Sequence, residues 1–183
     1  MFGVCYYPEH WPQSKWQEDA QMMAELGLTY VRIGEFAWSK LEPNPGELNF
    51  NWLDEAILTL SNAGLKVVLG TPTATPPKWL IDQHPDILPI DVNSGLVRGF
   101  GSRRHYDFSS EIYLRESIRI TKALAARYGA HRGVVGWQTD NELCCHDTTL
   151  SGSANALRGF QSWCRDRYQS IEQLNSDWGN VFW

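Results

Sequence analysis

Short apolar runs alternate along the chain with longer segments of helical spacing. Residues in the apolar runs are β-branched and aromatic to a large degree, which is typical of buried strands. These strand-like runs cover 2–7, 28–33, 65–69 and 134–138. The spacing predicts helices over 15–26, 51–63, 111–128, 154–168 and 170–178.

The first two predicted helices share the same signals. Trp16, Ala20 and Met23 fall on one side of the first, and Leu53, Ala56, Ile57 and Leu60 fall on one face of the second. A glycine ends each helix, and a strand begins directly after it. The segments 25–31 and 62–68 repeat this helix end, glycine and strand pattern 37 residues apart.

Continuous apolar strands that alternate with helices indicate a parallel sheet covered by helices. A doubly wound sheet would be favoured by a glycine-rich turn after the first strand, but 7–11 reads Tyr-Pro-Glu-His-Trp and no G-x-G-x-x-G motif occurs. A (β/α)8 barrel is therefore preferred. A complete barrel needs roughly 200 to 250 residues, so we expect residues 1–183 to form one unit, the N-terminal half of such a barrel, with the first four or so βα units.

The segments that follow the strands are much longer than those that precede them. We expect long loops over 34–50 and 70–110. This asymmetry places the elaborated surface at the carboxyl ends of the strands, where barrels carry their catalytic groups.

The fourth predicted strand runs into Asp140, Asn141 and Glu142. A carboxylate on a rigid strand end is suited to general acid/base catalysis, and Trp137 with Leu143 could give it an apolar surround. From the residues alone, Glu142 is about equally well explained as a surface residue that caps a following helix. Asn141 is a candidate to bind a sugar hydroxyl or a simple turn residue, and Asp140 is a second candidate carboxyl.

Arginines near the predicted strand ends are the next candidates. Arg32 should face a carboxylate, because arginine is rarely buried without a partner. It either keeps a catalytic nucleophile ionised or forms a salt bridge with Glu35 or Glu9. Arg103 lies in the motif 101–106, Gly-Ser-Arg-Arg-His-Tyr, where a solvated loop is the simpler interpretation.

Composition excludes several classes of function. The net charge is −5, the hydrophobic content is 43%, and no basic cluster exceeds Arg103-Arg104, so nucleic acid is not expected as a partner. No apolar run approaches the roughly 20 residues of a membrane span. The N-terminus reads as a strand rather than a signal peptide, which makes the cytoplasm the expected location.

The cysteine and tryptophan content gives little specific information about function. Four cysteines give no disulfide framework, and Cys144-Cys145-His146-Asp147 lacks a second half of a zinc site, so neither a metal nor another cofactor is expected. The chain has nine tryptophans. Trp11, Trp38 and Trp79 fall in polar, loop-like contexts where they could pack on sugar rings, although most tryptophans are better explained by packing between helices.

Taken together, the motifs resemble those of glycoside hydrolase family 42, the β-galactosidases, within the clan of retaining (β/α)8 glycosidases. The motifs that carry the resemblance lie at 6–12, 31–43, 71–80, 101–106, 137–142 and 178–183, in the order of the family.

The resemblance implies roles for four residues. It implies that Glu142 is the acid/base, that Asn141 and Arg103 bind the galactose at the cleavage subsite, and that Arg32 lies next to the nucleophile. The family's nucleophile follows the seventh strand, so no residue of this chain is assigned to it. Zinc-binding members carry a cysteine where this chain has Asp107, which agrees with the expectation of no metal.

The sequence thus predicts a retaining β-galactosidase that hydrolyses terminal β-D-galactose, in which this chain carries the acid/base but not the nucleophile. The isolated chain is expected to be inactive, whereas full-length members of the family commonly form trimers. Alternatives are a non-catalytic carbohydrate-binding half barrel, a related β-glycosidase specificity, and the product of an incomplete gene.

Overall fold

The computed structural model describes residues 2–101, 105–143 and 150–180. Its sheet has four parallel strands in the order β1-β2-β3-β4, which is also their order along the chain. The strands are β1 (Gly3–Cys5), β2 (Tyr30–Ile33), β3 (Lys66–Gly70) and β4 (Val134–Gln138). A parallel sheet in which neighbouring strands are also consecutive along the chain is the arrangement of a (β/α) barrel wall, whereas a doubly wound sheet reverses its order at a switch point.

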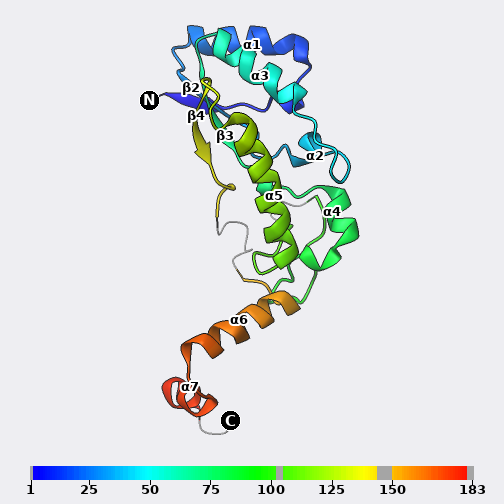
Figure 1. Cartoon of the computed structure of the whole chain (residues 1–183), viewed down its shortest axis with the longest axis vertical. Helices are drawn as coiled ribbons and strands as arrows, with labels where there is room; N and C mark the ends of the chain where they lie inside the picture. The colour runs from blue at the N-terminus through cyan, green and yellow to red at the C-terminus, as the bar shows by residue number, and fades with distance from the viewer. Residues whose placement is uncertain (1, 102–104, 144–149, 181–183) are drawn as a thin grey trace.

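The helices follow the predicted positions closely (Figure 1). The longer ones are α1 (Gln13–Glu25), α3 (Asn51–Asn62), α5 (Glu111–Tyr128), α6 (Ala154–Arg167) and α7 (Ile171–Trp178). The first strand is shorter than the predicted run 2–7, because Pro8 begins a 3₁₀ turn at Pro8–His10 and the chain leaves the sheet before it.

The predicted loops contain two helices that the sequence pattern did not reveal. These are α2 (Trp38–Leu41) and α4 (Lys78–Gln83), and 3₁₀ turns occur at Pro72–Ala74 and Pro85–Ile87. The interpretation of Trp38 and Trp79 as loop residues was therefore wrong. Trp38 is fully buried, and its indole Nε1 donates a hydrogen bond to the Glu42 carboxylate over 2.9 Å.

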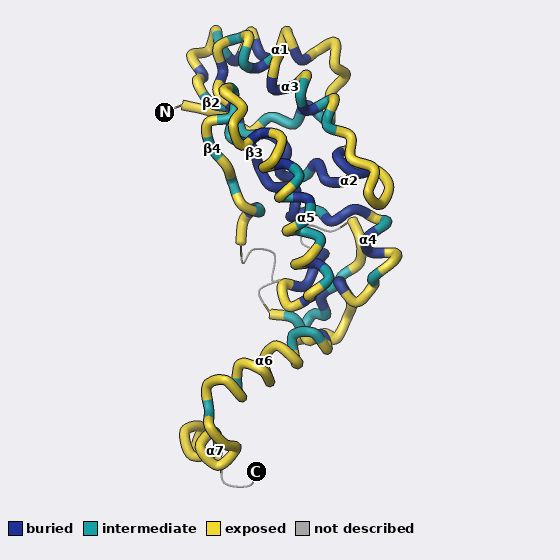
Figure 2. Tube along the Cα trace, viewed as in Figure 1, coloured by how far each residue is buried: buried dark blue, intermediate teal, exposed yellow. Residues whose placement is uncertain are grey.

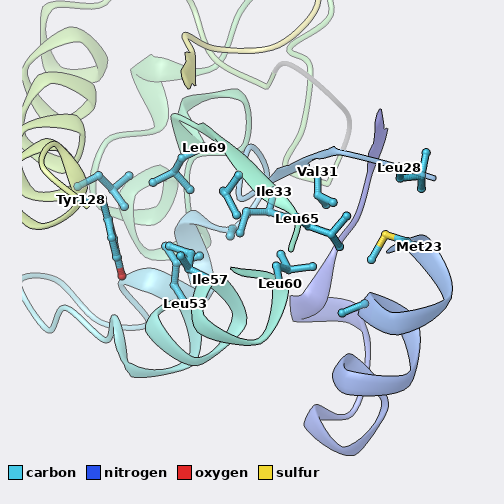
Figure 3. Close-up of a cluster of buried hydrophobic side chains, with 14 of the residues drawn as sticks. Met23, Leu28, Val31, Ile33, Leu53, Ile57, Leu60, Leu65, Leu69 and Tyr128 are labelled. Carbon is cyan, nitrogen blue, oxygen red and sulfur yellow. The ribbon is translucent and has the colours of Figure 1, made fainter. Parts of the chain in front are cut away.

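One face of the sheet packs against α1, α3 and α5 (Figure 3). Alternate strand residues such as Val31 and Ile33 contribute to this core, because successive side chains point to opposite faces. On α3, Leu53, Ile57 and Leu60 are almost fully buried at helical spacing. Burial of each such side chain contributes about 1.5–3 kcal/mol to the stability of the fold. This core therefore holds the sheet and the three helices together as two packed layers.

A second core lies beyond the carboxyl ends of the strands. It is formed by Trp38, Leu80, Ile81, Ile87, Tyr106, Tyr113 and Ile120. These residues come from α2, α4, α5 and the segment before α5, so parts of the long segments after β2 and β3 pack against α5, whereas 43–49 and 92–97 are exposed. Ser110 caps α5 by accepting a hydrogen bond from the Tyr113 backbone N–H.

The last two helices extend away from the sheet and bury none of their residues within the described part of the chain (Figures 1 and 2). Their apolar side chains, including Leu157, Phe160 and Trp163, are about half exposed. Across the described residues, no helix is both long and apolar enough to cross a membrane.

An ion pair joins α5 to α3 and makes stability depend on pH. The Arg127 guanidinium and the Tyr128 hydroxyl both donate to the Asp54 carboxylate, and Arg127 is the main cause of a pKa for Asp54 below its ordinary 3.8. Because the pKa of Asp54 is lower in the folded state, the ionised carboxylate stabilises the fold above pH 3.8, and this stabilisation is lost as the pH falls through the folded-state pKa.

We expect Asp54→Asn to lower the urea midpoint at pH 7, and the difference in midpoint from the wild type to shrink below pH 3.8. A difference that stays constant down to pH 2.5 would contradict this assignment.

Candidate active site

Polar residues from three neighbouring strands gather at the carboxyl edge of the sheet. They are Arg32 near the end of β2, Thr71 directly after β3 and Gln138 at the end of β4. The register pairs Arg32 with Val68, and Val68 with Gly136, which places Arg32 and Gly136 on one face of the sheet. Gln138 follows Gly136 by two positions and shares that face, opposite the core shown in Figure 3.

The turn after β4 has an unusual backbone. Asp140 and Glu142 adopt positive φ angles of 54° and 43°. Side chains other than glycine rarely occupy this left-handed region, and asparagine and aspartate tolerate it best. Strain of this kind costs on the order of 1–3 kcal/mol and is found mainly where the surroundings hold it in place, often at functional sites.

Hydrogen bonds hold this strained turn. The Tyr106 hydroxyl lies 2.9 Å from both carboxylate oxygens of Asp140, and the Asn141 backbone N–H donates to the same carboxylate over 2.7 Å. The Asp140 backbone N–H donates to the Thr71 hydroxyl over 2.7 Å. The ring of Tyr106 stacks on Tyr113 with centroids 4.3 Å apart. Asp140 therefore anchors the turn, and this explains its position better than a catalytic role does.

The turn places the side chains of Asn141 and Glu142 in different environments. Asn141 is buried, with 6% of its surface exposed, whereas Glu142 is exposed. The expected apolar surround of Glu142 does not form from Trp137 and Leu143, which are 38% and 64% exposed. The reason is strand geometry: Trp137 pairs with Leu69 and points to the other face of the sheet from Gln138.

Arg32 forms an ion pair with Glu35. The guanidinium Nη2 lies 2.8 Å from the Glu35 Oε1, and the Glu35 side chain is completely buried. Of the two partners considered from sequence, Glu35 is therefore correct and Glu9 is not. Gly70 makes room for Glu35, since a Cβ at that position would lie 2.6 Å from the Glu35 Cβ.

Aromatic rings border Arg32 and Glu35. Tyr7 stacks on Phe36 with centroids 5.9 Å apart and on His10 at 5.5 Å. Burial, followed by the negative charge of Glu35, raises the pKa of Tyr7, so its hydroxyl stays protonated. Trp11, one of the candidates for a sugar contact, is 55% exposed.

Glu9 is a further acidic group near this edge. Burial raises the pKa of its carboxyl above the usual range. The Lys40 ammonium contacts the Glu9 backbone carbonyl over 3.5 Å, so α2 is tied to the turn after β1.

Several sequence candidates fall outside the described residues. Arg103 is one of them, and Cys144 and Cys145 are others. The neighbouring part of the 101–106 motif is described: His105 is buried, and its ring Nε2 lies 3.0 Å from the Pro76 carbonyl. The described residues contain no group of three or more His, Cys, Asp or Glu side chains that could hold a metal ion.

Asp107, where the family's zinc-binding members carry a cysteine, is buried and acts in the fold. Its carboxylate accepts hydrogen bonds from the Ser109 backbone and from the Ser153 hydroxyl, which is also the N-cap of α6. This side chain therefore ties the segment before α5 to the start of α6.

Sequence reasoning gave no role to Tyr106, Thr71 and Gln138, although all three shape the site. A signal existed for Gln138, because a polar residue in an otherwise apolar strand needs a partner. Tyr106 and Thr71 both bond to Asp140, which follows them in the sequence by 34 and 69 positions, so no local pattern reveals these contacts.

The parallel strands are covered by helices on one face and carry a polar cluster at their carboxyl ends. This arrangement defines the first four βα units of a (β/α)8 enzyme barrel. Comparison with known proteins gives the family. The sequence model of glycoside hydrolase family 42, described as beta-galactosidase, matches residues 5–183, and the chain belongs to this family.

Individual relatives agree with this assignment. The chain is 58% identical to a beta-galactosidase from Thermus thermophilus over 183 residues, which are 100% of this chain and 28% of that protein. The crystal structure of beta-galactosidase from the psychrophilic Marinomonas ef1 is 58% identical and superposes with a TM-score of 0.96 over 100% of this chain and 28% of its own. A beta-galactosidase from Halorubrum lacusprofundi gives 48% identity and a TM-score of 0.93, over 27% of its length. This chain thus spans little more than a quarter of the relatives that it matches.

Proposed function

We propose that the protein is the N-terminal half of the catalytic barrel of a retaining β-galactosidase, and that Glu142 is its acid/base. The observation that carries the proposal is the turn after β4: it is strained, it is anchored by Tyr106 and Asp140, and it presents an exposed carboxylate next to a buried asparagine. Membership of family 42 supports the same assignment.

In this mechanism, Glu142 protonates the glycosidic oxygen while a second carboxylate attacks the anomeric carbon. Glu142 then takes a proton from water, which releases the galactose from the covalent intermediate. Retaining enzymes hold the two carboxyls about 5–5.5 Å apart. We propose that the second carboxylate belongs to the part of the barrel that the longer relatives carry.

The other site residues support this chemistry. Asn141 is proposed to bind a galactose hydroxyl, together with Arg103. Arg32 is proposed to lie beside the nucleophile and keep it ionised, a role that its ion pair with Glu35 supports because the pair holds the guanidinium in a fixed position. The cytoplasmic location and the trimeric assembly stay predictions.

A chimera tests the proposal. Residues 1–183 are fused to the part of the Thermus thermophilus β-galactosidase that follows its matching segment. We expect the chimera to hydrolyse nitrophenyl β-galactoside in preference to the β-glucoside and the α-arabinoside, and the isolated 183-residue chain to show negligible turnover.

Three outcomes would contradict the proposal. Preference for another glycoside would show a related specificity, and binding of galactose without turnover would favour a carbohydrate-binding role. Clear turnover by the isolated chain, lost on Glu142→Gln, would contradict the need for a second carboxylate from the rest of the barrel.

A further inference from the structure

Gln138 joins the two halves of the candidate site. Its side-chain Oε1 accepts a hydrogen bond from the Arg32 Nη1 over 2.6 Å. Its Nε2 donates to the Asp140 backbone carbonyl over 2.8 Å and lies 3.4 Å from the Asn141 Oδ1. One amide thus connects the arginine of β2 with the strained turn after β4.

The chemistry of Arg32 determines the direction of this connection. A guanidinium has only donors, so the atom of Gln138 that faces it must be the carbonyl oxygen. The amide nitrogen of Gln138 then necessarily points to the turn, where it meets two oxygens. The hydrogen-bond partners of Gln138 therefore determine which end of its amide carries the oxygen and which the nitrogen.

The orientation of the Gln138 amide in turn determines that of the Asn141 amide. Its Oδ1 faces the Nε2 donor of Gln138, so its own Nδ2 group occupies the other end of the amide. Asn141 is 6% exposed and its backbone is held through Asp140. Its side chain thus presents N–H donors, rather than an acceptor, to a group that binds beside it.

We infer that Gln138 is a positioning residue that sets the orientation of the Asn141 amide, so that Asn141 donates a hydrogen bond to one hydroxyl oxygen of the galactoside. The inference rests on the proposed function, and it adds the residue that determines how the substrate is recognised. The Arg32 guanidinium, held by its ion pair with the buried Glu35, serves in this arrangement as the fixed donor that orients Gln138.

The substitution that tests the inference is Gln138→Glu in the chimera. The carboxylate keeps an acceptor for Arg32 and nearly the same shape, but it has no donor for the Asn141 Oδ1. The Asn141 amide is then expected to turn over and present its oxygen outward. We expect kcat/KM for the galactoside to fall by about tenfold to a hundredfold, in the range found when a reacting group is misplaced.

Monodeoxy galactosides separate positioning from general damage. The Asn141→Ala variant identifies the hydroxyl that Asn141 binds, as the one whose removal no longer affects kcat/KM. For Gln138→Glu, the ratio of kcat/KM between the galactoside and that same analogue should also fall close to one, with the ratios for the other analogues unchanged. The control is Gln17→Glu, the same chemical change at an exposed position of α1, which should leave all ratios intact.

The outcomes are distinct. A uniform loss over all analogues, or unchanged ratios, in an active chimera would overturn the inference but not the proposed function. A parent chimera that folds and hydrolyses no galactoside would overturn both. If Gln138→Glu does not fold, as judged by its thermal melt, Gln138→Asn replaces it, because that variant keeps an amide but is too short to reach both partners.

Discussion

Replacing Glu142 by glutamine in the chimera is expected to lower kcat/KM for galactosides with poor leaving groups, such as alkyl galactosides, by about 10²–10⁴-fold. Glutamine has nearly the shape of glutamate but cannot transfer a proton to the glycosidic oxygen or accept one from water. The fold should be unaffected, because Glu142 is exposed and the strained turn is held through Asp140, Tyr106 and Thr71.

Steady-state kinetics on the purified variant measure this effect. Glu55→Gln, an exposed position of α3, is the matched control and should keep the parent's kcat/KM. A loss of less than about threefold for Glu142→Gln would mean that this carboxylate is not the general acid, and Asp140 would then have to be reconsidered.

The second large effect concerns stability. Glu42 is fully buried and accepts hydrogen bonds from the Trp38 indole over 2.9 Å, the Gly46 backbone over 2.8 Å and the Arg119 guanidinium over 2.7 Å. It therefore fastens α2 and the segment after it to α5. Glu42→Ala leaves the Trp38 indole and the Gly46 backbone N–H without this acceptor, and Arg119 keeps only its ion pair with Glu116. Removal of the buried partner from a charged network is strongly destabilising. We expect a loss of about 3 kcal/mol in the free energy of unfolding.

Urea denaturation compares this variant with Glu47→Ala. Glu47 lies in the same segment but is exposed, and its carboxylate accepts a hydrogen bond from the exposed Asn44 side chain. Its replacement should change the free energy of unfolding by no more than about 1 kcal/mol. Equal effects of the two substitutions would show that the buried network around Glu42 does not hold this region.

The periodicity of the chain was sufficient to predict the four strands and the longer helices. The glycines at 27 and 64 mark helix ends correctly, because both adopt positive φ angles. The helices α2 and α4 escaped detection for a physical reason: with four and six residues, they are too short to show a 3.6-residue repeat. They form because Trp38, Leu80 and Ile81 bury their side chains in the second core.

The site was predictable only in part. The position of Asn141 and Glu142 after a strand indicated where chemistry could occur, and a lone arginine at a strand end indicated a buried ion pair. The hydrogen bond between Arg32 and Gln138 joins residues 106 positions apart, and no local pattern reveals it. The strain at Asp140 and Glu142 was also hidden, because neither residue type requires a positive φ angle.

Azide rescue of a Glu142→Ala variant of the chimera tests whether Glu142 is the acid/base of a retaining enzyme. With a dinitrophenyl β-galactoside, the leaving group needs no protonation, so the variant should form the covalent intermediate but hydrolyse it slowly for lack of a general base. Azide needs no base and can enter the space that the carboxylate leaves. We expect faster turnover with added azide and a β-galactosyl azide product. No acceleration by azide, or a product of α configuration, would contradict the assignment of Glu142 as the acid/base of a retaining enzyme.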